Sequence, residues 1–192
     1  MTCRKDCAVL RLTSPDRTNK LGIATIARLL QAVEQLAAEA ERGRIQSLII
    51  TGNEKFFSAG ADLNEISRLG AAEAFEFSRR GQRLMNSIAR FPVPAIAAIQ
   101  GYCMGGGLDL ALSCRNRVAA PDAVFGHRGA SLGLITGWGG TQRLSRLVGR
   151  PRALQMFLLA EKLSAEEALK VGLVDRITND PVLTAQLSMS SS

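Results

Sequence analysis

Hydrophobic positions along this chain follow two periods, and their alternation predicts its elements. Between Thr25 and Gly43 apolar residues recur about every 3.6 positions, which predicts an amphipathic helix that Thr25 caps and Gly43 ends. The runs 48–50 and 95–99 are apolar at every position, a pattern typical of strands covered on both faces. Shorter strands are expected over 9–12, 117–120 and 174–177.

The other periodic segments predict helices between these strands. Helices are expected over 77–88, 108–114, 141–148 and 153–159. A last helix is predicted to begin at Ser164, where Glu167 would close a capping box. Strands and helices alternate without a linker, which predicts one α/β domain over residues 1–180 with mostly parallel strands. The polar residues 181–192 are expected to form a frayed tail.

Composition narrows the class of protein. A chain of 192 residues with 46% hydrophobic and 21% charged residues is typical of one soluble globular domain. No apolar run is long enough to span a membrane, and the first residues lack the features of a secretory signal. Four cysteines lie far apart beside a single histidine, which favours a reduced, cytoplasmic protein without a metal site.

The net charge of +7 favours anionic partners, such as RNA, a membrane surface or a phosphate-bearing cofactor. Its densest cluster consists of Arg143, Arg146, Arg150 and Arg152. A solvated helix face explains such a cluster more simply than a binding surface does. Aromatic residues, which stack on nucleic-acid bases, make up only 5% of the chain. We therefore expect neither a membrane nor a nucleic acid as partner.

Two buried strands run into similar loops. The run that ends at Thr51 leads into FFSAGADL, and the run that ends at Ile99 leads into GYCMGGGLDL. In open α/β folds ligands bind beyond the carboxyl ends of strands, where small residues let them approach the main chain. Free N–H groups at a helix start can donate to an anion, so two converging loops could hold an oxyanion. The alternative is a tight packing contact, because GGG is neither a P-loop nor GxGxxG.

Four segments together resemble the crotonase superfamily, the enoyl-CoA hydratase/isomerase family. They are LIITGNEKFFSAGADL, PVPAIAAIQGYCMGGGLDLAL, GWGGTQRLSRLVGRPRA and LSAEEALKVGLVDRI, and the resemblance covers residues 8–177. It implies an α/β fold built as a spiral of ββα units, and an acyl-CoA thioester whose enolate the enzyme stabilises. Coenzyme A would be part of the substrate, with no other cofactor. The family assembles as trimers or hexamers, but its C-terminal helical extension is largely absent from this sequence, which leaves the oligomeric state open.

The resemblance also implies roles for particular residues. The oxyanion-hole N–H groups would be those of Ala61 and Gly106. The residues expected to contact coenzyme A are Lys55, Ala59, Asp62 and Leu63. Lys55 matches a position that approaches the phosphates, although a solvated lysine beside a loop is an equal alternative.

The carboxylates depart from the family's patterns. Hydratases of the family use two glutamates; Asp109 stands at the first position and Gly129 at the second. Dienoyl-CoA isomerases use acids at the positions of Asp109, Gly129 and Gly137, so two of their three acids are replaced by glycine in this sequence. Hydration is easiest with a paired acid and base, whereas a single carboxylate can move a proton between two carbons and suits isomerisation. Asp109 could instead be an acid that the helix dipole favours in a first turn.

His127 could replace the missing acid, because imidazole is a common acid–base group near neutral pH. If its segment is extended, His127 and Gly129 face the same side. A structural histidine is the commoner outcome. Arg128 could meet a phosphate or an acidic substrate, and Trp138 is expected in the core or in a pocket wall.

The resemblance makes an enoyl-CoA hydratase of fatty acid metabolism, the default of the family, the leading hypothesis. The alternatives are an enoyl-CoA isomerase with one carboxylate, a non-catalytic acyl-CoA-binding or assembly protein, and an RNA-binding protein that uses the basic surface.

Overall fold

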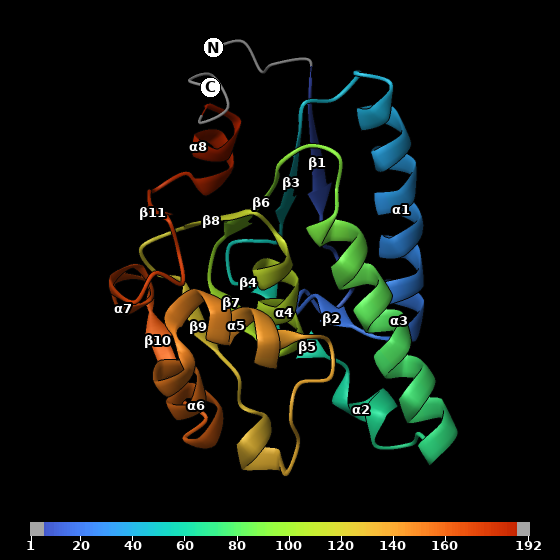
Figure 1. Ribbon diagram of the computed structural model, residues 1–192, viewed down its shortest axis with the longest axis vertical. Coiled ribbons are helices and arrows are strands. Elements are labelled where there is room, and N and C mark those ends of the chain that lie inside the picture. Colours follow the sequence, from blue (N-terminus) through green and yellow to red (C-terminus); the bar gives the residue numbers. More distant parts are fainter. Residues whose placement is uncertain (1–5, 188–192) are drawn as a thin grey trace.

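The computed structural model describes residues 6–187, and a parallel five-stranded sheet lies at its centre (Figure 1). Its strands, in spatial order, are β1 (Cys7–Arg11), β3 (Ser47–Thr51), β6 (Ala95–Ile99), β8 (Asn116–Ala119) and β11 (Arg176–Ile177). Each neighbouring pair is parallel. All residues of β3 and β6 are buried, which explains the apolar runs 48–50 and 95–99 within them.

A second sheet, of short strands, continues from the ends of the first. It comprises, in spatial order, β10 (Lys162–Ser164), β9 (Val124–Gly126), β7 (Tyr102–Met104) and β4 (Phe56–Ser58). Only β10 is antiparallel to its neighbour, so the predicted mostly parallel pairing is confirmed. The strands β3, β6 and β8 each pass into a short strand of this sheet before the next helix, which produces the expected ββα repeat. A further pair consists of β2 (Lys20–Leu21) and β5 (Gly60–Ala61).

Two long helices, α1 (Ile23–Glu41) and α3 (Ala71–Ala89), lie side by side against one edge of the molecule (Figure 1). The prediction that Thr25 caps the first helix is wrong, because α1 begins at Ile23 and Gly22 occupies the N-cap position. The Ile23 N–H donates to Glu65 Oε2 at 2.7 Å, so a carboxylate distant in sequence caps the helix. Glu65 belongs to the short helix α2 (Leu63–Ile66).

The other helices cover the second sheet and the far end of the first. They are α4 (Gly106–Ser113), the 3₁₀ helix η1 (Gly129–Leu132), α5 (Gly140–Val148), α6 (Arg150–Leu158), α7 (Ala165–Lys170) and α8 (Pro181–Leu187). The predicted capping box at Ser164 is confirmed: its hydroxyl accepts from Glu167 N, and the Glu167 carboxylate accepts from Ser164 N at 2.8 Å. None of the helices formed by residues 6–187 has the length and apolar character needed to cross a bilayer.

The C-terminal segment differs from its prediction. Instead of a frayed tail from residue 181, the structure has helix α8, which packs against β3, β6 and β8. Ala185 joins a buried cluster with Ile49, Ile96 and Val118. A small buried residue in a polar stretch is a weak sequence signal, which is why the helix was missed; residues 188–192 lie outside the described part.

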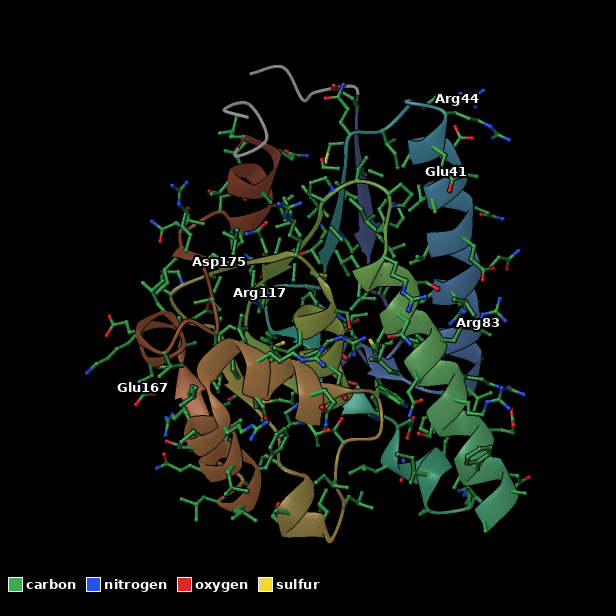
Figure 2. The ribbon with its side chains drawn as sticks, in the orientation of Figure 1. Glu41, Arg44, Arg83, Arg117, Glu167 and Asp175 are labelled. Carbon is green, nitrogen blue, oxygen red and sulfur yellow. The ribbon has the colours of Figure 1, made fainter. Side chains whose placement is uncertain are left out.

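One of the arginines that contribute to the positive net charge has a structural role. Arg117 on β8 is buried, and its Nε donates to Leu173 O at 2.7 Å while Nη1 donates to Cys114 O at 2.8 Å. Its Nη2 lies 3.4 Å from the carboxylate of Asp175, which precedes β11 (Figure 2). This arginine therefore ties the last strand of the central sheet to its neighbour.

Candidate active site

A cavity of about 870 Å³ lies where both predicted loops end. The loop that leads to β5 contributes Ala59 and Ala61 to its wall, and the turn before α4 contributes Gly105 and Gly106. The opposite wall comes from the segment 127–138, which includes His127. Two loops about 45 residues apart in sequence thus meet at one site beyond the short strands, as expected for parallel strands.

Glycines allow the main chains of the two loops to touch. A Cβ at Gly60 would lie 2.6 Å from Met104 O and 3.0 Å from Gly106 N. A Cβ at Gly107 would lie 2.7 Å from both Ser58 O and Ser58 Cβ. Gly60 also has a φ of +92°, a conformation that residues with a side chain rarely adopt. The packing alternative for GGG is therefore correct, and it is the means by which the two loops reach one cavity.

Gly106 is the first residue of α4, a position whose N–H has no acceptor inside the helix and lies at the positive end of its dipole. Ala61, on β5, lines the same cavity. The structure thus brings together the two residues predicted to form an oxyanion hole.

Asn19 holds the first loop in place, and the sequence analysis missed it. Its Nδ2 donates to Phe56 O at 2.8 Å and to Phe57 O at 3.3 Å. Its main-chain carbonyl accepts a hydrogen bond from Ser58 Oγ at 2.7 Å, and the Ser58 hydroxyl in turn accepts one from Gly60 N at 3.1 Å. Asn19 is 2% exposed and has a φ of +53°, which asparagine tolerates better than most residues. The only sequence signal was an asparagine in a turn before an apolar run.

Asp109 lies in the first turn of α4, 1% exposed, at the base of the cavity. The hydroxyl of Thr136 donates to its Oδ2. Its Oδ1 lies 3.2 Å from Nε2 of His127, a contact that lacks the geometry of a hydrogen bond. Neither atom has another hydrogen-bond partner among the described residues. Asp109 and His127, predicted separately, are therefore in direct contact.

The sequence profile described as "Enoyl-CoA hydratase/isomerase" matches residues 3–189. This chain belongs to the enoyl-CoA hydratase/isomerase family. It is 39% identical over 181 residues to a crotonyl-CoA hydratase of Syntrophomonas wolfei, covering 94% of this chain and 68% of the relative. It is 36% identical over 171 residues to a short-chain-enoyl-CoA hydratase of Clostridium acetobutylicum, covering 88% and 64% respectively. The chain thus spans about two thirds of the length of these curated relatives.

The solved structure of Pseudomonas aeruginosa DspI is similar to this chain with a TM-score of 0.90 and 36% identity. The match covers 96% of this chain and 70% of that structure. With this similarity, the ββα repeat is the crotonase-type fold that the sequence resemblance implied.

The position of the family's second hydratase glutamate is closed in this member of the enoyl-CoA hydratase/isomerase family. The segment is not extended there, because β9 ends at Gly126 and η1 begins at Gly129, so the condition for His127 and Gly129 to share a side is not met. A Cβ at Gly129 would lie 2.5 Å from Leu134 O. Of the residues that line the cavity, Asp62 and Asp109 are the acids, and the Asp62 carboxylate already caps α2 by accepting from Asn64 N.

Trp138 is both a core residue and part of the cavity wall, as predicted. Its ring packs against Phe77 and fills the space beside Gly81 and Gly106, where any Cβ would overlap it. Arg143 donates to Trp138 O at 2.9 Å. Burial lowers the pKa of Arg143, and the charge of Asp109 opposes that shift.

The arginine cluster is therefore only partly the solvated face that the sequence favoured. Arg143 also donates to Asn86 Oδ1 at 2.8 Å, and Arg152 pairs with Glu161 at 2.9 Å.

The residues predicted to contact coenzyme A divide into two groups. Ala59, Asp62 and Leu63 line the cavity, whereas Lys55 is exposed and is not among its lining residues. The sequence analysis missed two other lysines of the wall, Lys20 and Lys162. A hydrogen bond to Asp16, at 2.9 Å, raises the pKa of Lys20. No cluster of His, Cys, Asp and Glu side chains within residues 6–187 is suited to hold a metal ion.

Proposed function

We propose that this chain carries the active site of an enoyl-CoA hydratase, which adds water reversibly to a 2-enoyl-CoA thioester. One observation carries the proposal: Ala61 and Gly106, on loops in main-chain contact, line the same cavity as the buried carboxylate of Asp109. The relatives named crotonyl-CoA hydratase and short-chain-enoyl-CoA hydratase support this class of substrate and favour a short acyl chain.

The oxyanion hole stabilises the enolate. The thioester oxygen accepts hydrogen bonds from the N–H groups of Ala61 and Gly106 as negative charge develops on it. Donors held in place by close packing need no reorganisation during the reaction, and removing one such donor typically costs about 10²–10³-fold in rate. The dipole of α4 adds to this stabilisation, because Gly106 begins the helix.

Proton transfer belongs to Asp109. Water adds to C3 of the enoyl group, and C2 receives a proton as the enolate collapses. A carboxylate at the base of the cavity is suited to take the proton from water or to supply the proton of C2. Coenzyme A enters as part of the substrate, with Ala59, Asp62 and Leu63 beside it. The cations of the cavity wall are Lys20, Arg128 and Lys162.

Double-bond isomerisation is the second candidate function. It is favoured by the missing second acid, since Gly129 has no room for a side chain and Asp62 caps α2. One carboxylate can remove a proton from C2 of a 3-enoyl-CoA substrate, which gives a dienolate, and return it to C4 to form the conjugated 2-enoyl-CoA.

We further propose a cytoplasmic homo-oligomer, a trimer or a hexamer, that acts in fatty acid metabolism. Leu154, Leu158 and Leu159 are 58%, 66% and 68% exposed at the end of α6, which supports association there. The free thiols of Cys103 and Cys114 support a reducing compartment, and burial raises the pKa of Cys114 to about 12. Light scattering after gel filtration would test the assembly, and a monomeric mass would contradict it.

The decisive experiment supplies crotonyl-CoA to the purified protein and follows the loss of conjugated absorbance, with 3-hydroxybutyryl-CoA identified by chromatography. A parallel reaction with a 3-enoyl-CoA, in which conjugated absorbance rises, detects isomerisation. Tight acyl-CoA binding without either reaction, unchanged in Asp109→Ala, would contradict both functions and leave a binding protein.

A further inference from the structure

Two buried polar atoms face each other in the cavity wall, and neither has a hydrogen-bond partner within residues 6–187. They are Oδ1 of Asp109 and Nε2 of His127, 3.2 Å apart, on side chains that are 1% and 4% exposed. Polar atoms buried in this way are normally satisfied, and exceptions require an explanation. Their distance of 3.2 Å lies within the hydrogen-bond range, so a small turn of the imidazole would place one proton between the two atoms and satisfy both.

Neighbouring groups hold both side chains in this arrangement. Thr136 donates to Oδ2 of Asp109, which leaves Oδ1 toward the imidazole. The His127 ring packs at a tilt of 44° against Phe157 of α6, with ring centroids 5.1 Å apart. A Cβ at Gly140, the first residue of α5, would overlap Oδ1 of Asp109, so the lack of a side chain there makes room for the carboxylate.

The other ionisable groups around the pair do not provide a second acid. From α5, Arg143 interacts electrostatically with Asp109, and its guanidinium is engaged by Trp138 O and Asn86. From β7, Cys103 is fully buried, and burial, more than the nearby Asp109, raises the pKa of its thiol. His127 is therefore the group placed to act with Asp109.

We infer that His127 is a second catalytic residue, which shares one proton with Asp109 so that the two side chains act as a single acid–base unit. This inference rests on the proposed function, because it supplies the second proton site that Gly129 cannot provide. His127 lines the cavity together with Asp109, so both groups border the volume that the acyl chain would occupy.

The shared proton balances the hydration step. The water oxygen bonds to C3, and the O–H bond that breaks gives its proton to the pair. The proton already held by the pair goes to C2, where the electron pair of the enolate forms the new C–H bond. The pair holds one proton before and after, and no other reactant is needed.

The test uses the fact that the chain has one histidine. In a long-range ¹H–¹⁵N spectrum of the uniformly labelled protein, the imidazole signals report His127 alone. We expect Asp109→Asn to move the Nε2 resonance, because the carboxylate partner is lost, and the matched variant Asp122→Asn in an exposed turn to leave it unchanged. Unchanged Nε2 signals in Asp109→Asn would contradict the shared proton, and this measurement needs no activity.

A kinetic measurement completes the test. His127→Gln is expected to lower kcat for crotonyl-CoA about 10²-fold with KM within threefold, in the range usual for losing an acid–base group. Added imidazole is expected to restore part of the activity of His127→Ala, an effect that a purely structural role would not produce. An active wild-type enzyme with unaffected His127→Gln would overturn this inference alone, whereas an inert wild-type protein would overturn the proposed function as well.

Discussion

The two walls of the cavity are built differently. One wall consists of the paired loops before β5 and α4, where glycines bring main chains into contact and Asn19 holds the carbonyls of Phe56 and Phe57. The other wall is the segment 127–138, which forms no strand and extends to the bottom of Figure 1 around η1. The side chains of Leu132 and Ile135 in this segment are 55% and 72% exposed to solvent.

The second wall is attached at few points. Gln82 on α3 donates to Gly137 O at 2.8 Å, and Arg143 donates to Trp138 O. Yet this segment supplies the two side chains that meet Asp109, namely His127 and Thr136. The comparison teaches that main-chain donors need dense packing, whereas the side-chain chemistry depends on an irregular segment held by a few hydrogen bonds.

The largest effect is expected where the walls meet. Asp109→Asn keeps the shape of the side chain but removes its charge, so we expect kcat for crotonyl-CoA to fall about 10³-fold with acyl-CoA binding retained. Steady-state kinetics and calorimetric titration with a non-reactive acyl-CoA check this. Asp122→Asn is the control, and an active Asp109→Asn would remove the carboxylate from the mechanism.

The next effect concerns the first wall alone. Gly106→Ala places a Cβ into the ring of Trp138, which must move together with the donor N–H. We expect a loss of about 10²-fold in kcat, typical of one oxyanion donor, and about 1–3 kcal/mol of unfolding free energy from overpacking. Activity assays and urea denaturation measure both; wild-type values would mean that the contact between Gly106 and the indole is not tight.

A smaller effect is expected from the support of that wall. Asn19→Gly keeps the left-handed backbone without strain and removes the side-chain donors. We expect about 1–3 kcal/mol of destabilisation because buried carbonyls lose their partner, and roughly tenfold in kcat, as misplaced catalytic groups lose rate. Asn19→Asp should behave similarly, since aspartate also lacks the side-chain N–H donors. Wild-type stability and kcat in Asn19→Asp would show that the hydrogen bonds to Phe56 O and Phe57 O do not hold the loop.

The smallest effect is expected at the attachment of the second wall. Gln82→Leu removes an exposed hydrogen bond to Gly137 O, for which we expect at most about 1 kcal/mol in unfolding free energy. We expect kcat to change by about twofold to threefold, because Arg143 still holds Trp138. A loss as large as that of Asn19→Gly would show that both walls are equally constrained.

Much of the candidate site was predictable, because its signals are short and local. Small residues after two buried strands indicated the two loops, and the resemblance to the family assigned Ala61, Gly106 and Asp109 within them. Asn19 and Thr136 were not predictable, since each acts on a partner at least 27 residues away and neither belongs to a recognisable motif. Lys55 was predicted for the cofactor side of the cavity, whereas Lys20 and Lys162 line it.

The sequence by itself determined the buried strands and the long helices, because the apolar runs of β3 and β6 and the 3.6-residue period of α1 and α3 are properties of neighbouring residues. The tertiary structure alone decided the short strands of the second sheet, which at three residues carry no period and exist only through their neighbours. It also decided the docking of α8 and the contact between Asp109 and His127. Both depend on side chains that meet only after the chain has folded, so no local pattern encodes them.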